Sequence, residues 1–110
     1  MEFDVELSGP DGALIRTSGR LNLVSAPKLR DLVTRIVRTD GRSHVVLDLA
    51  GTDFVDSTGL GALISGLKTA RAAGGDLRIA RAGAQVTMAL QLTGLDSILE
   101  SHDTVEECLQ

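Results

Sequence analysis

A short apolar run near the middle of the chain, Val-Val-Leu-Asp-Leu at residues 45–49, constrains the fold most. The run is nearly continuous and begins with β-branched residues, a pattern typical of a central strand that is buried on both faces. The segment from about Ser57 to Ala73 has apolar residues at helical spacing. Two glycines follow this segment, and glycine commonly ends a helix. A buried strand followed closely by a helix indicates an α/β fold.

The segments before this run predict a β-hairpin and a first helix. Residues 3–7 alternate between apolar and acidic side chains, which is typical of a half-buried strand. The turn-forming sequence Gly-Pro-Asp-Gly at residues 9–12 leads into a second extended segment at residues 13–17. Ser25 is expected to cap a helix with apolar residues at helical spacing, and Gly41 follows its end.

The second half of the chain predicts four shorter elements. They are a strand at residues 77–80, a helix at 86–92, a short strand at 95–99 and a last helical turn or two at 104–109. Strands alternate with helices after the hairpin. We therefore expect one domain over residues 1–110, with a mixed sheet and helices packed against it.

Composition narrows the classes of partner. Of the 110 residues, 43% are apolar, which excludes a disordered protein, and only 2% are aromatic, which argues against base stacking on single-stranded nucleic acid. The net charge of −4 argues against a general binder of phosphate backbones, so no direct nucleic-acid partner is expected. Cys108 is the only cysteine, so the chain has no internal disulfide and no cysteine metal cage. With no signal-like or membrane-spanning run, a cytoplasmic protein without cofactor, metal or membrane partner is expected.

A hydroxyl lies at the predicted start of the second helix, in the sequence Asp-Ser-Thr-Gly-Leu-Gly at residues 56–61. Ser57 could cap the helix, bind an anion, act as a nucleophile or accept a phosphate. Capping by Asp56 or Ser57 is the default role of such residues and stabilises a helix by about 0.5–2 kcal/mol. Capping does not exclude the other three roles.

Nucleophilic catalysis needs a base beside Ser57, and the sequence marks none. His44 lies just before the buried strand and therefore at the opposite end from Ser57, and nothing identifies His102 as a base. The phosphate-loop sequence Gly-x-x-x-x-Gly-Lys-Ser/Thr is absent, and Lys68 lies three helical turns away, so only a weak nucleotide site stays open. We therefore expect no catalytic residue in this chain.

Phosphate acceptance by Ser57 has a clear physical consequence. A phosphate carries about −1.5 to −2 charges at neutral pH, and the dipole and free N–H groups of a helix N-terminus tolerate it. A partner docked over uncharged residues would then meet a dianion, at a cost of several kcal/mol. Each increment of about 1.4 kcal/mol changes an affinity tenfold, so interface electrostatics suffice for a switch.

The second helix has an uncharged side. On a helical wheel, four large apolar residues cluster on the side expected to face the sheet: Leu60, Leu63, Ile64 and Leu67. The opposite side carries only small uncharged residues: Thr58, Gly61, Ala62, Ser65 and Thr69. Glycine inside a helix costs about 0.8–1.0 kcal/mol relative to alanine, so Gly61 is expected to serve some purpose. That side is either a docking surface for a partner's backbone or a site of tight packing within the chain.

Five motifs lie in a fixed order along the chain. They are Ser-Ala-Pro-Lys-Leu at residues 25–29, Val-Leu-Asp-Leu at 46–49, Phe-Val-Asp-Ser-Thr-Gly-Leu-Gly at 54–61, Gly-Gly-Asp-Leu at 74–77 and Leu-Thr-Gly-Leu at 92–95. In these motifs the chain resembles the bacterial anti-sigma factor antagonists, which are single STAS-domain proteins. The resemblance implies a mixed four- to five-stranded β-sheet with helices packed mainly on one face.

The resemblance also implies a function. In that family the serine that corresponds to Ser57 is phosphorylated by a partner that is both an anti-sigma factor and a serine kinase with a histidine-kinase-like ATPase fold. The unphosphorylated antagonist binds this partner and frees a sigma factor, and a PP2C-type phosphatase reverses the modification. The chain would thus regulate sigma-factor-dependent transcription as a substrate and switch, not as an enzyme.

One loop departs from the family pattern. Members usually have Gly-Glu-Leu/Ile-Asp, whereas this chain has Gly-Arg-Leu-Asn at residues 19–22, with both acidic positions changed. The resemblance places this loop near the phosphorylated serine, so Arg20 could attract the phosphate or select a different kinase surface. The alternative function is a constitutive, unphosphorylated STAS interaction module in a signalling assembly. The expected partner surface comprises Arg20, Asn22, Asp56, Thr58, Gly61, Ala62 and Ser65.

Overall fold

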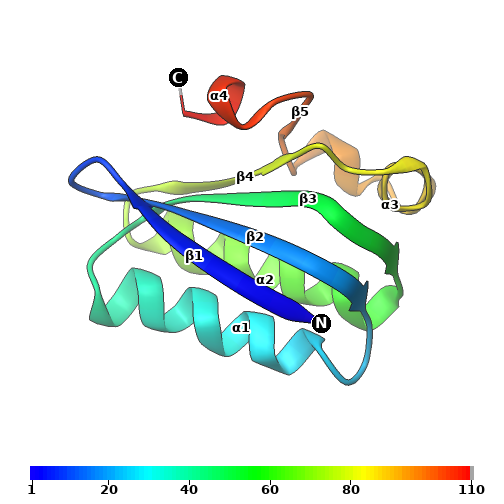
Figure 1. Cartoon of the computed structure of the whole chain (residues 1–110), viewed down its shortest axis with the longest axis horizontal. Coiled ribbons are helices and arrows are strands. Elements are labelled where there is room, and N and C mark those ends of the chain that lie inside the picture. Colours follow the sequence, from blue (N-terminus) through cyan, green and yellow to red (C-terminus); the bar gives the residue numbers. More distant parts are fainter. Residues whose placement is uncertain (110) are drawn as a thin grey trace.

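A five-stranded sheet forms the centre of the molecule in the computed structural model, which describes residues 1–109 (Figure 1). In their order across the sheet, the strands are β1 (Glu2–Ser8), β2 (Gly12–Leu21), β3 (His44–Val55), β4 (Asp76–Ala80) and β5 (Ser101–His102). β1 and β2 form the predicted antiparallel hairpin. β2, β3, β4 and β5 pair in parallel, so the predicted mixed sheet is confirmed.

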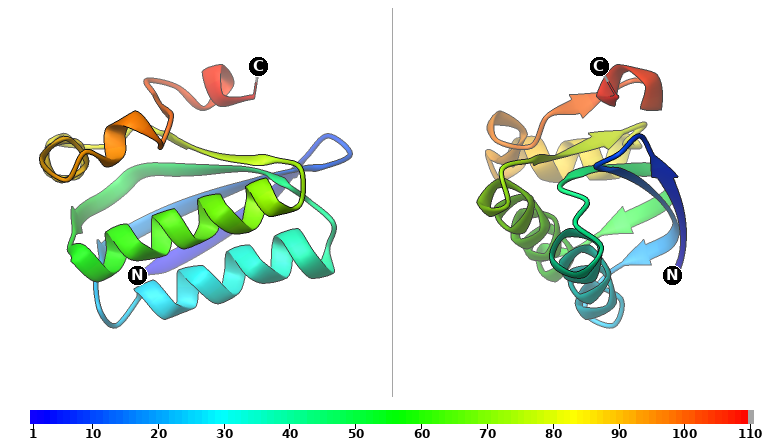
Figure 2. Two further views of the ribbon diagram at one scale, coloured as in Figure 1. Left: turned by 180° about the vertical axis from the view of Figure 1, so that it is seen from behind. Right: turned by 90° about the vertical axis from the view of Figure 1, so that its left-hand side faces the viewer.

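Two helices cover one face of the sheet (Figure 2). They are α1 (Ala26–Thr34), which continues into the π-helical turn η1 (Arg35–Thr39), and α2 (Ser57–Ala72). The chain is completed by α3 (Ala84–Leu92), the 3-10 turn η2 (Leu95–Ser97) and the short α4 (Val105–Cys108). The predicted helices of residues 86–92 and 104–109 are therefore present.

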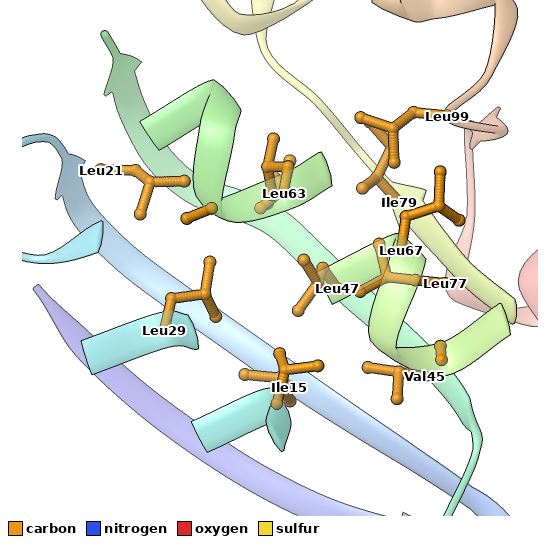
Figure 3. Close-up of a cluster of buried hydrophobic side chains, with 14 of the residues drawn as sticks. Ile15, Leu21, Leu29, Val45, Leu47, Leu63, Leu67, Leu77, Ile79 and Leu99 are labelled. Atoms are coloured by element: carbon orange, nitrogen blue, oxygen red, sulfur yellow. The ribbon is translucent and has the colours of Figure 1, made fainter. Parts of the chain in front are cut away.

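The main hydrophobic core lies between the sheet and the helix pair α1 and α2 (Figure 3). Ile15, Leu47 and Ile79 from three strands meet Leu63 and Leu67 from α2. The core is aliphatic, as the low aromatic content predicts. A smaller cluster lies on the other face of the sheet, under α4, and contains Leu14, Val46, Ala80 and Cys108.

The apolar run at residues 45–49 contributes to both clusters. Val45, Leu47 and Leu49 point into the main core, and Val46 points into the smaller one. Successive side chains of a strand point to opposite faces, so a continuous apolar run requires both faces to be covered. The prediction of a central strand buried on both sides is confirmed.

The prediction of a strand at residues 95–99 was wrong. The backbone N–H groups of Ile98 and Leu99 instead bond back to the carbonyl of Leu95, at 3.1 and 2.9 Å. This turn follows Gly94, whose φ of 73° redirects the chain. A short apolar run fits a turn and a strand equally well, and the paired strand begins only at Ser101.

The apolar face of β1 is less covered than the alternating pattern predicts. Phe3 packs against the main core, but Val5 and Leu7 are 38% and 59% exposed. β1 lies at the edge of the sheet and has a neighbouring strand on one side only.

Within residues 1–109, no helix has the length and apolar character needed to cross a membrane.

Candidate functional site

Ser57 lies at the end of the sheet where the parallel strands finish. β3 ends at Val55 and α2 begins at Ser57, so only Asp56 separates strand from helix. Val55 pairs in register with Leu21, the last residue of β2, which brings the loop after β2 to the same end of the molecule. Ligands and partners of open α/β sheets commonly bind outside the carboxyl ends of parallel strands. This end of the sheet is therefore the candidate functional site.

Asp56, not Ser57, caps α2. Asp56 Oδ1 accepts a 2.8 Å hydrogen bond from the backbone N–H of Gly59, and Oδ2 accepts one of 3.2 Å from the backbone N–H of Leu23. One carboxylate thus holds both the start of the helix and the loop after β2. Within residues 1–109 the exposed Ser57 hydroxyl makes no hydrogen bond, so it is free to react.

Gly59 allows α2 to start against the end of β2. A Cβ atom at this position would lie 2.3 Å from the backbone oxygen of Leu21, closer than any such contact can be. The close approach sets the height of the first turn of α2 relative to the strand. It therefore helps to fix the position of Ser57 at the surface.

A glutamine that the sequence did not single out holds the end of β3. Gln85 in α3 accepts a 2.9 Å hydrogen bond from the backbone N–H of Val55 and donates one of 3.0 Å to its carbonyl oxygen. The side-chain amide replaces the pairing that another strand would give there. No local pattern marks this role, because it depends on a helix that follows Val55 by thirty residues.

The loop between β2 and α1 is held by its own polar side chains. Asn22 Oδ1 accepts hydrogen bonds from the backbone N–H groups of Val24 and Ser25, at 3.0 and 3.3 Å. Ser25 stands at the predicted N-cap position but its side chain does not cap α1. Its buried hydroxyl instead donates a 2.7 Å bond to the carbonyl of Arg20, because the tight loop places that carbonyl within reach. The loop consequently displays Leu23 and Val24, which are 70% and 74% exposed.

Comparison with known proteins identifies the family. Residues 4–108 match the sequence pattern of the STAS domain. The chain belongs to the STAS domain family. An anti-sigma F factor antagonist of Paenibacillus polymyxa is 28% identical over 104 residues, which cover 94% of this chain and 89% of that protein.

Solved structures show the same fold. An anti-sigma factor antagonist from Mycobacterium paratuberculosis has a TM-score of 0.83 and 26% identity, and the match covers 98% of this chain and 90% of that one. The Bacillus cell fate determinant SpoIIAA in its phosphorylated form has a TM-score of 0.77 at 18% identity, over 98% of this chain and 96% of that one.

The buried side of α2 in this STAS domain differs from the helical-wheel expectation. Its buried residues are Gly59, Leu60, Ala62, Leu63, Gly66, Leu67 and Ala70. Ala62 is only 1% exposed, so placing it on an exposed partner surface was wrong. Small residues on this side let α1 pack closely against α2, and a wheel drawn from one helix cannot include that neighbour. Thr58, Gly61 and Ser65 stay partly accessible beside the exposed Ser57.

The Arg20 guanidinium of the STAS domain lies over the ring of Phe54, 4.3 Å from its centre. The two residues are register partners on β2 and β3, so the contact follows from the strand pairing. This cation–π contact holds the exposed charge on β3 and not against Ser57. Arg20 is therefore at the same end of the sheet as Ser57, in a fixed position of its own.

An ion pair between the buried carboxylate of Asp48 and the half-exposed guanidinium of Arg81 joins β3 to the loop after β4. Asp48 is 2% exposed and accepts hydrogen bonds from the guanidinium of Arg81, one of them 3.0 Å long, and from the backbone N–H of Ala50. Burial alone would raise the pKa of Asp48, but these bonds and the charges of Arg81 and Arg16 outweigh it and lower the pKa. Arg81 adopts a φ of 56°, unusual for a non-glycine residue.

The two histidines and the cysteine of the STAS domain lie away from Ser57. His44 stands at the opposite end of β3 and contacts Asp11, whereas His102 contacts Glu100 and Glu107. Burial raises the pKa of Cys108 to about 11, so its thiol is protonated at neutral pH. Among residues 1–109, no group of three His, Cys, Asp or Glu side chains is arranged to hold a metal ion.

Proposed function

We propose that this STAS domain is an anti-sigma factor antagonist controlled by phosphorylation of Ser57. The unphosphorylated protein binds an anti-sigma factor that is also a serine kinase, and phosphorylation releases it. One observation carries the proposal: Ser57 is exposed and its hydroxyl makes no hydrogen bond to any described residue, because Asp56 caps α2. A serine in that position can react without unfolding the helix.

The relatives support this assignment. The Paenibacillus polymyxa protein is named an anti-sigma F factor antagonist, and SpoIIAA has been solved in a phosphorylated form. In the proposed reaction, Ser57 Oγ forms a bond to the γ-phosphorus of ATP, and the bond from that phosphorus to the bridging oxygen of ADP breaks. The serine proton passes to a base on the kinase. A PP2C-type phosphatase would restore the hydroxyl, and the domain itself is regulatory and works in the cytoplasm.

The partner surface surrounds Ser57. It comprises Arg20, Asn22, Asp56, Thr58, Gly61 and Ser65 from the sequence prediction, to which the exposed Leu23 and Val24 are added. The two apolar side chains can be buried by a partner, which is worth roughly 1.5–3 kcal/mol for each fully buried side chain. A dianion on Ser57 opposes that burial because its hydration shell must be removed.

A phosphorylation assay tests the proposal. The purified domain is incubated with ATP and the serine-kinase anti-sigma factor of the same organism, and intact mass spectrometry counts the phosphates. We expect one phosphate in the wild type and in Thr58→Val, which removes the neighbouring hydroxyl, and none in Ser57→Ala. A phosphate that persists in Ser57→Ala would overturn the assignment.

Binding measurements test the partner surface. Ser57→Ala should keep its affinity for the kinase in the presence of ATP, and Ser65→Arg should fold normally by circular dichroism yet bind at least tenfold more weakly. Unchanged binding of Ser65→Arg would remove this part of α2 from the partner surface.

A constitutive interaction module is the second candidate function. It is favoured by Arg20, whose positive charge is fixed on Phe54 and is therefore presented in the same way whatever the state of Ser57. Such a module would retain its partner equally with and without ATP. The same binding assay, run in both conditions, separates the two functions.

A further inference from the structure

The side chain of Arg30 in α1 lies across α2 at Gly61. A Cβ atom at Gly61 would be 3.1 Å from Arg30 Nη2, so the guanidinium occupies the space that the missing side chain leaves. This contact gives a reason for a glycine inside α2. Gly61 thus leaves space for the positively charged guanidinium of Arg30 on the surface of α2.

Gly61, where the Arg30 guanidinium lies, is one helical turn from Ser57. Residues four apart on a helix lie on the same face, with Cβ positions about 5–6 Å apart, so Ser57 and Gly61 are surface neighbours. α1 and α2 start at the same end of the sheet and run side by side (Figure 2). Side chains of a helix lean toward its N-terminus, and the N-terminus of α1 is at the end of the sheet where Ser57 lies.

Among the residues that the structure describes, no ion pair balances the charge of Arg30. In the described part of the chain, residues 1–109, the arginines that form ion pairs with carboxylates are Arg16, Arg71, Arg78 and Arg81. Within residues 1–109, Arg30 has no carboxylate within 4.0 Å. The nearest acidic neighbour of Ser57 in sequence, Asp56, already uses both oxygens on backbone N–H groups. A cation near the positive end of a helix dipole gains stability only when an anion joins it.

We propose that Arg30 is the intramolecular counter-ion of the phosphate on Ser57. This inference rests on the proposed function, since it concerns the phosphorylated serine. A guanidinium can hold a phosphate through two parallel hydrogen bonds. Held in this way, the phosphate lies over Gly61 and covers the uncharged part of the partner surface, so one modification both adds charge and blocks access to the backbone.

The test uses protein in which phosphoserine replaces Ser57 during translation, so no kinase is needed. The second pKa of the phosphate is measured by ³¹P NMR titration in the wild-type background, in Arg30→Gln and in Arg38→Gln. Arg38→Gln removes the same charge from an exposed residue about two turns further along the same helical segment. We expect the pKa in Arg30→Gln to be about half a unit higher than in the other two proteins.

Two further variants make the outcome specific. Arg30→Lys keeps the charge without the planar fork and should recover only part of the shift. Gly61→Ala fills the space that the Arg30 guanidinium occupies, so it should raise the second pKa of the phosphate although Arg30 is present. Equal pKa values in the wild type and Arg30→Gln, or an equal rise in Arg38→Gln, would overturn the inference. Such a result would leave the kinase assay and the proposed function unaffected.

Discussion

Asp56 connects two segments through a single carboxylate. Its two oxygens accept hydrogen bonds from Gly59 in α2 and from Leu23 in the loop after β2. The hydroxyl of Ser57 is free for modification because its neighbour performs the capping. At the scale of single residues, the structure assigns the cap to Asp56 and leaves the Ser57 hydroxyl accessible for the proposed phosphorylation.

Replacing Asp56 tests this arrangement. Asp56→Ala loses the cap and the bond to the loop, so we expect the free energy of unfolding to fall by about 1–3 kcal/mol. Urea denaturation followed by circular dichroism measures the change. Asp53→Ala, at an exposed neighbour, is the control and should stay within about 0.5 kcal/mol of the wild type. Equal values for the two variants would show that Asp56 is not the cap.

The ionised carboxylate of Asp48 makes the free energy of unfolding depend on pH in the acid range. Its pKa is lowered in the folded state relative to an unfolded value of about 3.9, so the ionised form stabilises the fold. This contribution is complete above about pH 5 and is lost as the pH falls through the folded-state pKa. Asp48→Asn should therefore have a lower urea midpoint than the wild type at pH 7, and the difference should shrink at pH 3. A difference independent of pH would assign the effect to packing alone.

At the scale of elements, α2 is positioned by its glycines. Gly59 allows contact with the end of β2, Gly61 carries the guanidinium of Arg30, and Gly66 faces Leu77 and Val33. The helix wheel predicted the large apolar residues of the buried side but missed Ala62, because α1 also packs against this side. Of the two roles proposed for the small residues of α2, tight packing within the chain therefore applies to Ala62. Gly61 and Ser65 stay partly accessible to a partner.

Replacing Gly59 and Gly61 with alanine should change the stability of the domain in opposite directions. Gly59→Ala places a Cβ against the fixed backbone oxygen of Leu21, so we expect a loss of about 1–3 kcal/mol of stability. Gly61→Ala meets only the flexible end of Arg30, so the better helix propensity should add up to about 1 kcal/mol. Thermal unfolding of both variants checks the contrast. A destabilised Gly61→Ala variant would mean that Arg30 cannot move aside.

At the scale of the whole molecule, the sheet is shared by both hydrophobic clusters. Val46 on one face and Val45 and Leu47 on the other are consecutive in β3, so neither cluster can be lost without disturbing the strand. The ion pair of Asp48 and Arg81 adds a link between β3 and the segment that leads to α3. The expectation of one domain follows from this sharing.

We therefore predict a single cooperative unfolding transition. Urea curves from far-ultraviolet circular dichroism and from methyl NMR signals of both clusters should coincide, as in two-state unfolding of small domains. The methyl groups of Val46 and Leu47 are suitable reporters because they lie in different clusters. Separate midpoints for the two signals would divide the chain into two units.

The sequence by itself predicted most of the elements and indicated Ser57 as the candidate for modification. The periodicity of residues 45–49, the turn at 9–12 and the helix beginning at Ser57 are local patterns, because strand and helix periods repeat within a few residues. Tertiary structure alone decided that Gln85 holds Val55, that Ala62 is buried and that Arg30 lies beside Gly61. The contacts of Gln85 with Val55 and of Arg30 with Gly61 join residues about thirty positions apart. Their geometry depends on how close the packed elements come, which no local pattern encodes.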